Sequence, residues 1–350
     1  MKKNYSRNTL IIGAGAHAPY GFPTGKHLRE DILSLGCKNV ARTSNEVQIS
    51  SGDFRKLLCA LFPAKELVSH DDNKIKLERT LNDFCDLFRR SAEPTIDSFL
   101  TRHIDKKTGV EGLTYPILGK TIVSYIIYKY FSHINNNNHK RDWIEHLFDV
   151  YFKTDRDVET FFNPAPKIIT FNYDTYLETR IYDRLRISHH FDDIKAREYI
   201  EALSIEHIYG KMPYSFGNKV LEDKEIIEES IRTLKVVGEE RNGKDELSNK
   251  IATCIYKSKN IYFLGFGFDE DNTAFLFKDI ADNASNKFFF YSTNIGLGLN
   301  KRNNINEFVP RPVNINFSHF GEGKTEIHCT DLLDIKPLDD EGVDAGSLLR

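Results

Sequence analysis

The chain of 350 residues is long enough for one large domain with an insertion or for two modest domains, each with a sizeable core. With 40% hydrophobic and 28% charged residues, its composition excludes collagen-like, low-complexity and wholly disordered proteins. The formal net charge of −3 creates no overall attraction to nucleic acid or to an anionic membrane, so we expect no direct nucleic-acid binding.

The N-terminus is basic, but the apolar run that follows it, Leu10 to Ile12, ends at a glycine. This run is far shorter than the core of a signal peptide or a membrane span of about 20 residues, so we expect a cytoplasmic protein without membrane association. The five cysteines are scattered and include no C-x-x-C pair. They predict buried thiols and neither a disulfide framework nor a zinc site.

The first predicted element is a buried strand over residues 8–12 that ends in Gly13-Ala14-Gly15. A helix is expected from Thr24 to Leu35, with Thr24 as its N-cap. A glycine turn between a first strand and a helix is where doubly wound folds hold a pyrophosphate, because backbone N–H groups face the anion there. The usual dinucleotide fingerprint is incomplete, since Ala18 stands at its third glycine position.

Residues 37–164 have helical periodicity without a convincing strand and predict an α-helical insertion, with a polar loop at 135–139. Because an isolated insertion needs cover for its apolar faces, its aromatic residues favour a homo-oligomer. These residues are Tyr125, Tyr128, Tyr130, Phe131, Phe148, Tyr151 and Phe152.

Later apolar segments alternate with helical stretches, which favours a parallel sheet covered on both faces. The predicted fold class is therefore α/β, a Rossmann-like doubly wound parallel sheet with a large α-helical insertion. The core would comprise residues 1–36 and 165–335, followed by a C-terminal tail at 336–350. The predicted strands are 167–171, 205–209, 260–266 and 288–291, with a weaker one at 325–329; the helical stretches are 175–185 and 223–256, the second broken at 238–245.

Four sequence blocks occur in the order found in sirtuins. The string GAGAHAPYGFPTGK, starting at Gly13, matches the sirtuin pattern G-A-G-x-S-x-x-x-G-I-P-x-F-R without a gap. The blocks 170–174 (TFNYD), 207–210 (HIYG) and 263–269 (FLGFGFD) resemble the family's T-Q-N-x-D block, its His-Gly stretch and its late glycine block. The resemblance is closest to the bacterial SIR2-like branch, whose members commonly serve as NAD-consuming effectors in anti-phage defence.

This resemblance implies an NAD glycohydrolase, which converts NAD and water to nicotinamide and ADP-ribose, with NAD as the substrate and no metal. The zinc ribbon of sirtuins is missing, which disfavours protein deacetylation. A sensor that binds NAD or ADP-ribose without turnover and an NAD-dependent protein deacylase remain the alternatives. The branch also suggests a partner defence protein such as an ATPase.

By resemblance, Asn172 orients water or a ribose hydroxyl, and its amide can both donate and accept without adding a charge. Asp174 would contact the nicotinamide carboxamide, cap the following helix, or do both. His17 replaces the family's serine, either as a phosphate donor or as a surface histidine. Asp269 to Asp271 are expected at a helix start, not as metal ligands. The residues expected to bind NAD are Gly13, Ala14, Gly15, Phe22, Pro23, Thr170, Asp174, Gly265, Phe266 and Gly267.

The general base is the assignment at which this chain departs from the family pattern. In the family it is the histidine directly before the glycine of His-Gly, where this chain has Tyr209, with His207 two residues earlier. On a continuous strand the two side chains would share a face. Three interpretations stay open: His207 is the base, Tyr209 only hydrogen-bonds the ribose, or Tyr209 replaces and inactivates the histidine. We favour low intrinsic activity, with His207 lining the site.

Overall fold

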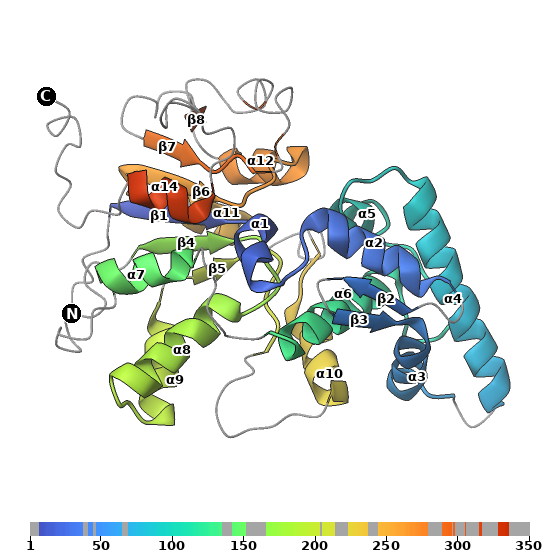
Figure 1. The fold of residues 1–350 in the computed structure, drawn as a ribbon. Helices are drawn as coiled ribbons and strands as arrows, with labels where there is room; N and C mark the ends of the chain where they lie inside the picture. The colour runs from blue at the N-terminus through green and yellow to red at the C-terminus, as the bar shows by residue number, and fades with distance from the viewer. Residues whose placement is uncertain are drawn as a thin grey trace, which may run out of the picture.

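The computed structural model describes residues 7–37, 41–44, 47–64, 69–134, 142–151, 166–203, 205–213, 223–236, 244–278, 289–295, 297, 305, 315–316 and 328–335. Within these residues, a six-stranded sheet with its covering helices lies beside a second, mostly helical part (Figure 1). We call this second part, which comprises described residues between 25 and 132 together with 223–233, the helical lobe.

The sheet is parallel throughout its described strands, in the order β5-β4-β1-β6-β7-β8. Numbered along the chain, the sheet strands run 3-2-1-4-5-6, the order of doubly wound dinucleotide-binding folds. The predicted Rossmann-like α/β class with a helical insertion is therefore confirmed. The strands are β1 (Asn8–Ile12), β4 (Lys167–Thr170), β5 (Ile205–His207), β6 (Asn260–Leu264), β7 (Phe289–Ser292) and β8 (Ile315–Asn316).

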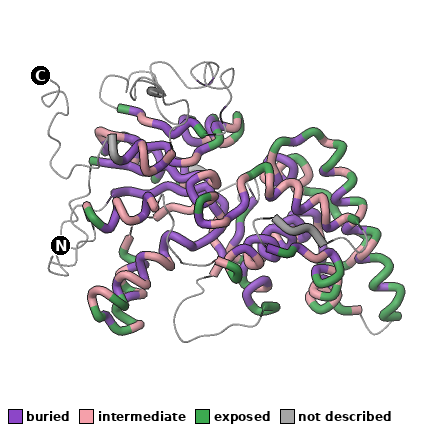
Figure 2. Tube along the Cα trace, viewed as in Figure 1, coloured by how far each residue is buried: buried purple, intermediate pink, exposed green. Residues whose placement is uncertain are grey.

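The central strands are buried along nearly their whole length because both faces of the sheet are covered. Leu10 and Ile12 pack into one hydrophobic cluster, whereas Ile11 between them packs into the other. Successive side chains of a strand point to opposite faces, so a strand buried on both sides has no polar alternation. Figure 2 shows these strands as buried along their length. The first face is covered by α7 (Trp143–Tyr151), α8 (Tyr176–Ser188) and α14 (Cys329–Ile335), and the second by α11 (Lys244–Tyr256) and α12 (Glu270–Phe277).

The helical lobe is organised around α6, most of whose side chains are buried. Helices α2 to α6 of the lobe each begin after a Ser or Thr residue whose hydroxyl accepts a backbone N–H, as Thr24 does from His27. None of the described helices has the length and apolarity needed to span a membrane. The lobe consists of α2 (Gly25–Leu35), β2 (Ala41–Ser44), β3 (Val47–Ser50), α3 (Ser51–Leu61), α4 (His70–Arg90), α5 (Ile96–Arg102), α6 (Tyr115–Ser132) and α10 (Asp223–Thr233).

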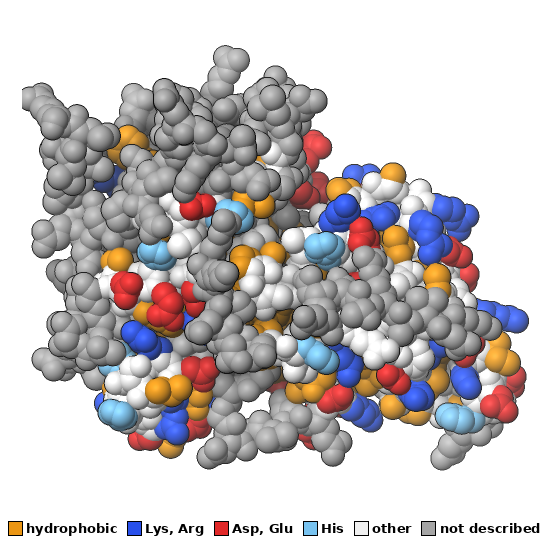
Figure 3. Space-filling model, viewed as in Figure 1, with side chains coloured by type: hydrophobic (Ala, Val, Ile, Leu, Met, Phe, Trp, Pro, Cys, Tyr) orange, Lys and Arg blue, Asp and Glu red, His pale blue; other side chains and the backbone are white. Residues whose placement is uncertain are grey.

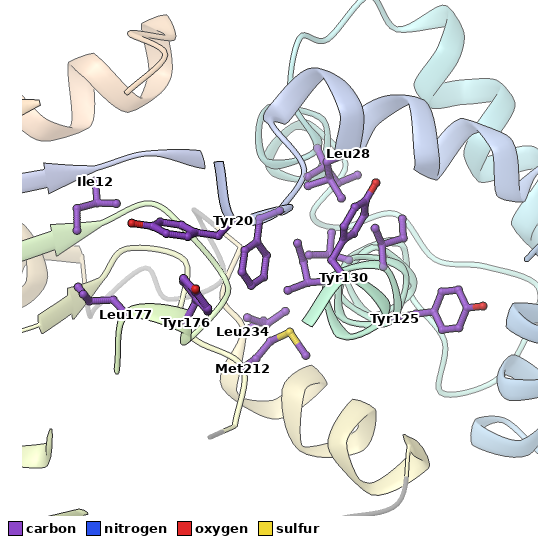
Figure 4. Packing of buried hydrophobic residues seen from close by; sticks show 14 of the residues in the cluster. Ile12, Tyr20, Leu28, Tyr125, Tyr130, Tyr176, Leu177, Met212 and Leu234 are labelled. Atoms are coloured by element: carbon purple, nitrogen blue, oxygen red, sulfur yellow. The ribbon is translucent and has the colours of Figure 1, made fainter. Parts of the chain in front are cut away.

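A continuous core joins the helical lobe to the sheet. Tyr20, in the short 3-10 helix η1 (Ala18–Tyr20), lies against Tyr176 with ring centroids 4.9 Å apart (Figure 4). Phe22 follows and contacts both Tyr176 of α8 and Phe131 of α6. Aromatic residues directly after the glycine turn thus connect the two parts of the molecule.

The lobe differs from the predicted insertion at its boundaries. Helix α2 packs on α4 and α6, and α10 packs on α6, although both lie outside residues 37–164. Helix α7 lies inside that range but packs on α14 beside the sheet. The chain therefore enters and leaves the lobe more often than one insertion would require, because helices from either side share the apolar surface of α6.

Two strands of the lobe and one strand of the sheet were missed by the sequence analysis. Strands β2 and β3 form an antiparallel pair in which Val47 and Ile49 are buried and Gln48 is exposed. Strand β8 has only two residues, which is too short for a periodicity to register. The weak strand predicted at 325–329 is wrong at Cys329, which begins helix α14, and its residues 325–327 lie outside the described residues.

Other expectations can be compared with side-chain burial. Cys85 and Cys329 are buried as predicted, but Cys37 is exposed. Tyr125, Tyr130 and Phe148 are buried within the chain itself, so they do not offer the uncovered apolar face on which the prediction of a homo-oligomer was based. Residues 135–139, 152 and 336–350 lie outside the described residues. On the face in Figure 3, acidic and basic side chains are interspersed over the helical lobe.

Candidate functional site

A cavity of about 550 Å³ lies at the carboxyl ends of the central strands. Residues that follow β1, β4, β5 and β6 line it, together with residues of the helical lobe. The order of the sheet strands reverses between β1 and β6, and open α/β sheets bind ligands at such a switch point. The volume falls within the range of about 300–1,000 Å³ that is usual for ligand pockets.

Most of the predicted site residues meet at this cavity. Thr170 and His207 are the two exceptions. The hydroxyl of Thr170 instead accepts the backbone N–H of Asn172 at 3.1 Å, and so supports the turn that carries Asn172. The predicted residues that do line the cavity are Gly13, Ala14, Gly15, Phe22, Pro23, Asn172, Asp174, Tyr209, Gly265, Phe266 and Gly267.

The glycines after β1 and β6 allow two backbone turns to touch. The N–H of Gly15 donates to the carbonyl of Gly265 at 3.0 Å, and the N–H of Gly13 donates to that of Leu264 at 2.9 Å. A Cβ on Gly13 would lie 2.6 Å from the carbonyl oxygen of Gly265. Both glycine N–H groups therefore face protein carbonyls, which differs from the expectation that they would face a pyrophosphate.

Gly265 is the most constrained of these glycines, and we expect Gly265→Ala to destabilise the fold. Its φ of +58° is unfavourable for other residues, and a Cβ there would overlap the backbone nitrogen of Ala16. The combined strain and overlap should lower the free energy of unfolding by at least about 2 kcal/mol, measured by urea denaturation. Gly267→Ala is the matched control, because a Cβ at Gly267 meets open space. Equal stability of the two variants would contradict this account.

Asn172 lies in a buried polar cluster with His17 and Asp174. His17, the last residue of α1 (Ala14–His17), has its Nδ1 2.8 Å from Asp174 Oδ1 and 3.1 Å from Asn172 Nδ2. Only 2% of His17 is exposed, so of the two interpretations left open for it, the surface histidine is wrong. Its ring stacks on Trp143, with centroids 6.1 Å apart, because α7 covers this side of the glycine turn.

Asp174 serves two structural purposes at once. Its Oδ1 accepts the backbone N–H of Tyr176 at 3.0 Å at the start of α8, as well as facing His17. Burial by itself raises the pKa of Asp174, but the charge and hydrogen bond of His17 outweigh it and hold that pKa below its usual value. At neutral pH Asp174 is therefore ionised, and its Oδ1 is engaged by His17 and Tyr176.

Two polar atoms of this cluster have no hydrogen-bond partner among the described residues. They are Oδ1 of Asn172 and Nε2 of His17, and both are buried. A buried polar atom without a partner is costly, and it usually indicates a functional role or a bound molecule. Because Asn172 also lines the cavity, its amide oxygen can accept a hydrogen bond from a ligand hydroxyl or a water.

His207 points away from the cavity, which corrects the expectation that it lines the site. Its Nε2 lies 2.7 Å from Glu178 Oε1 on α8, and its Nδ1 lies 3.2 Å from the carbonyl oxygen of Asn172. Strand β5 ends at His207, so Tyr209 is in the turn beyond it and packs in the hydrophobic cluster of the opposite sheet face. The two side chains therefore do not share a face.

Tyr209 does line the cavity, and its hydroxyl donates to Oδ1 of Asn272 on α12. Burial raises the pKa of the Tyr209 phenol well above its usual value, and the nearby Asp97 and Asp269 carboxylates raise it further. At neutral pH the phenol therefore keeps its proton. Because its one O–H is given to Asn272, the hydroxyl can accept a hydrogen bond from a ligand but cannot serve as a base.

The sequence analysis missed Asp97, which lines the cavity from helix α5 of the lobe. Its Oδ1 accepts a hydrogen bond from the hydroxyl of Tyr173, another lining residue that was not singled out. Burial raises the pKa of Asp97 to about 7, the Tyr173 bond opposes that rise, and the charge of Asp269 adds to it. In the sequence, Asp97 is an ordinary acidic residue in the first turn of a helix after the cap Thr95.

Acidic residues at the start of α12 behave as predicted, with the side chain of Asp269 accepting the N–H of Asn272 at 3.0 Å. Among the described residues, no group of three or more His, Cys, Asp or Glu side chains is placed to hold a metal ion.

The sequence matches no protein-family model and has no significant match among curated proteins. The fold and the cavity define the class: a Rossmann-like α/β protein with a ligand-sized cavity at the switch point of its sheet.

Proposed function

We propose that this protein is an NAD glycohydrolase, which releases nicotinamide and ADP-ribose from NAD and water, and that it acts as an NAD-depleting effector in bacterial anti-phage defence. One observation carries the proposal: three of the four sequence blocks that resemble sirtuins supply several lining residues of one cavity at the switch point, and the fourth supplies Tyr209. In a doubly wound fold the residues that follow the central strands gather at the ligand-binding edge of the sheet, and the four blocks lie at this edge.

The chemistry of the lining residues fits this substrate. Cleavage of the nicotinamide–ribose bond passes through a transition state with positive charge on the ribose, which neutral hydrogen-bonding groups can stabilise. The free amide oxygen of Asn172 fits a ribose hydroxyl or the attacking water. Lys26, exposed at the edge of the cavity, offers a cation to the pyrophosphate.

A second candidate is a sensor that binds NAD or ADP-ribose without turnover. It is favoured by one specific observation: no histidine is among the described residues that line the cavity. The family's base is a histidine, and a phenol at position 209 that keeps its proton does not replace it.

Incubation of the purified chain with NAD, followed by chromatography of nicotinamide and calorimetry with ADP-ribose, separates the two candidates. Release of nicotinamide supports the glycohydrolase. Binding of ADP-ribose without release supports the sensor, and neither release nor binding would overturn both. We also propose that the chain assembles as a homo-oligomer and that a partner such as an ATPase activates it. The assay is repeated over a range of protein concentrations, because the activity of an oligomer depends on concentration.

A further inference from the structure

Hydrolysis of the nicotinamide–ribose bond of NAD releases a proton, because nicotinamide leaves as a neutral pyridine and does not take up the proton of the attacking water. A hydrolase of this class therefore needs a proton acceptor. The titratable side chains that line the cavity fall into three kinds. They are the carboxylates Asp97, Asp174 and Asp269, the phenols Tyr173 and Tyr209, and the cations Lys26 and Arg29.

Most of these groups are poor acceptors. The cations have no free lone pair. Burial raises the pKa values of Tyr173 and Tyr209 well above their usual value, so both phenols stay protonated. Asp174 is held in its ionised form by His17 and the N–H of Tyr176, which makes it a weak base.

Asp269 and Asp97 remain. Asp269 caps helix α12 through the backbone N–H of Asn272 and is thereby engaged. Asp97 lines the cavity from the first turn of α5, and its Oδ1 accepts a hydrogen bond from the hydroxyl of Tyr173. Because Tyr173 directly follows Asn172 in the chain, this bond attaches the carboxylate to the loop that carries Asn172.

Asp97 is also held rigidly. It lies in the first turn of α5, where Thr95 caps the helix and Ile96 and Phe99 are buried in the core. A reactive group supported by a packed helix keeps its geometry better than one on a free loop. The pKa of about 7 that burial gives this carboxyl suits proton transfer at neutral pH.

We propose that Asp97 is the general base of this site, accepting the proton of the water that attacks the ribose; the inference rests on the glycohydrolase function proposed above. The water oxygen forms a bond to the anomeric carbon as the carbon–nitrogen bond breaks. The electron pair of that bond goes to the pyridinium nitrogen, which becomes neutral in nicotinamide. The water proton goes to the Asp97 carboxylate and then to solvent. The helical lobe would thus supply a catalytic residue that completes the Rossmann-like core.

The main test compares Asp97→Asn with the wild-type chain. General-base catalysis typically contributes about 10²–10⁴-fold, so kcat for NAD should fall by at least about 100-fold. Calorimetric affinity for ADP-ribose should change little, because the substitution preserves shape and removes only the charge. Thermal unfolding of both proteins checks that the fold is intact, and Asp97→Glu, which keeps a carboxylate, should recover part of the activity.

The pH dependence gives a second readout, which a merely structural role would not move. Activity should fall as pH drops through the pKa of Asp97, because the protonated carboxyl cannot accept a proton. The groups that face Asp97 are Tyr173, Tyr209 and Asp269. Asp269→Asn removes a neighbouring negative charge but keeps a helix cap. It should lower the pKa of Asp97 and so shift the acidic side of the pH–activity profile to lower pH. Tyr173→Phe removes the hydrogen bond that stabilises the ionised Asp97 carboxylate. It should raise the pKa of Asp97 and shift the acidic side of the profile to higher pH.

The outcomes separate the two proposals. Suppose that the wild-type chain hydrolyses NAD. If Asp97→Asn then retains more than a tenth of the wild-type kcat, or if neither Asp269→Asn nor Tyr173→Phe shifts the acidic side of the pH–activity profile, the assignment of Asp97 is overturned while the glycohydrolase function stands. If the wild-type chain releases no nicotinamide, both are overturned.

Discussion

Asn172→Ala is expected to abolish release of nicotinamide by a chain that remains folded. The side chain lies at a strand end and not within a hydrophobic cluster, and its buried amide oxygen has no hydrogen-bond partner in the part of the chain that the structure describes. Loss of a preorganised group that stabilises a transition state typically costs about 10²–10³-fold in kcat. A fall of at least about 100-fold is therefore expected in a continuous assay of NAD consumption.

Asn249→Ala is the matched control, since it removes the same side chain from an exposed position on α11 outside the cavity. It should leave kcat unchanged. Circular dichroism of both variants checks folding. Substantial activity in a well-folded Asn172→Ala protein would remove Asn172 from the site, because the role assigned to it acts through the amide alone.

Much of the sheet could be predicted because its strands contain short uninterrupted runs of β-branched or aromatic residues, such as 168–170 and 261–263. The position of Asn172 and Asp174 followed from the same signal. Residues directly after buried parallel strands collect at one edge of the sheet, which is the ligand edge.

The orientation of His207 could not be predicted, since it depends on the residue at which β5 ends. A strand that continued through Tyr209 would have turned the two side chains to one face, whereas the observed end at His207 separates them. Strand ends are set by tertiary contacts, here the bond of the Tyr209 carbonyl to the N–H of Lys235 after α10.

Asp97 was missed, and the burial of His17 was not foreseen, for a related reason. Trp143 and Tyr176, which bury His17, are more than 120 residues away in the chain, and the partner of Asp97, Tyr173, is 76 residues away. No local periodicity carries such contacts. The contribution of the helical lobe to the cavity therefore becomes visible only when the chain is folded.

His207→Ala is expected to destabilise the protein strongly while sparing the chemistry. The His207 ring and the Glu178 carboxylate form a buried pair, with side chains only 5% and 2% exposed. Removal of one partner from a buried pair leaves a charge without compensation and typically costs about 3–5 kcal/mol. Urea denaturation should report a loss of that order.

The double variant His207→Ala with Glu178→Gln supplies the control, because it also removes the charge that the single variant leaves uncompensated. It should recover part of the lost stability. The kcat of His207→Ala is measured at a temperature where the variant is still native and is expressed per folded molecule. We expect a decrease much smaller than that for loss of a general base, which would lower kcat by about 10²-fold or more. A drop of that size in a folded His207→Ala chain would instead return the role of base to His207, and would require its ring to leave Glu178 and reach the cavity.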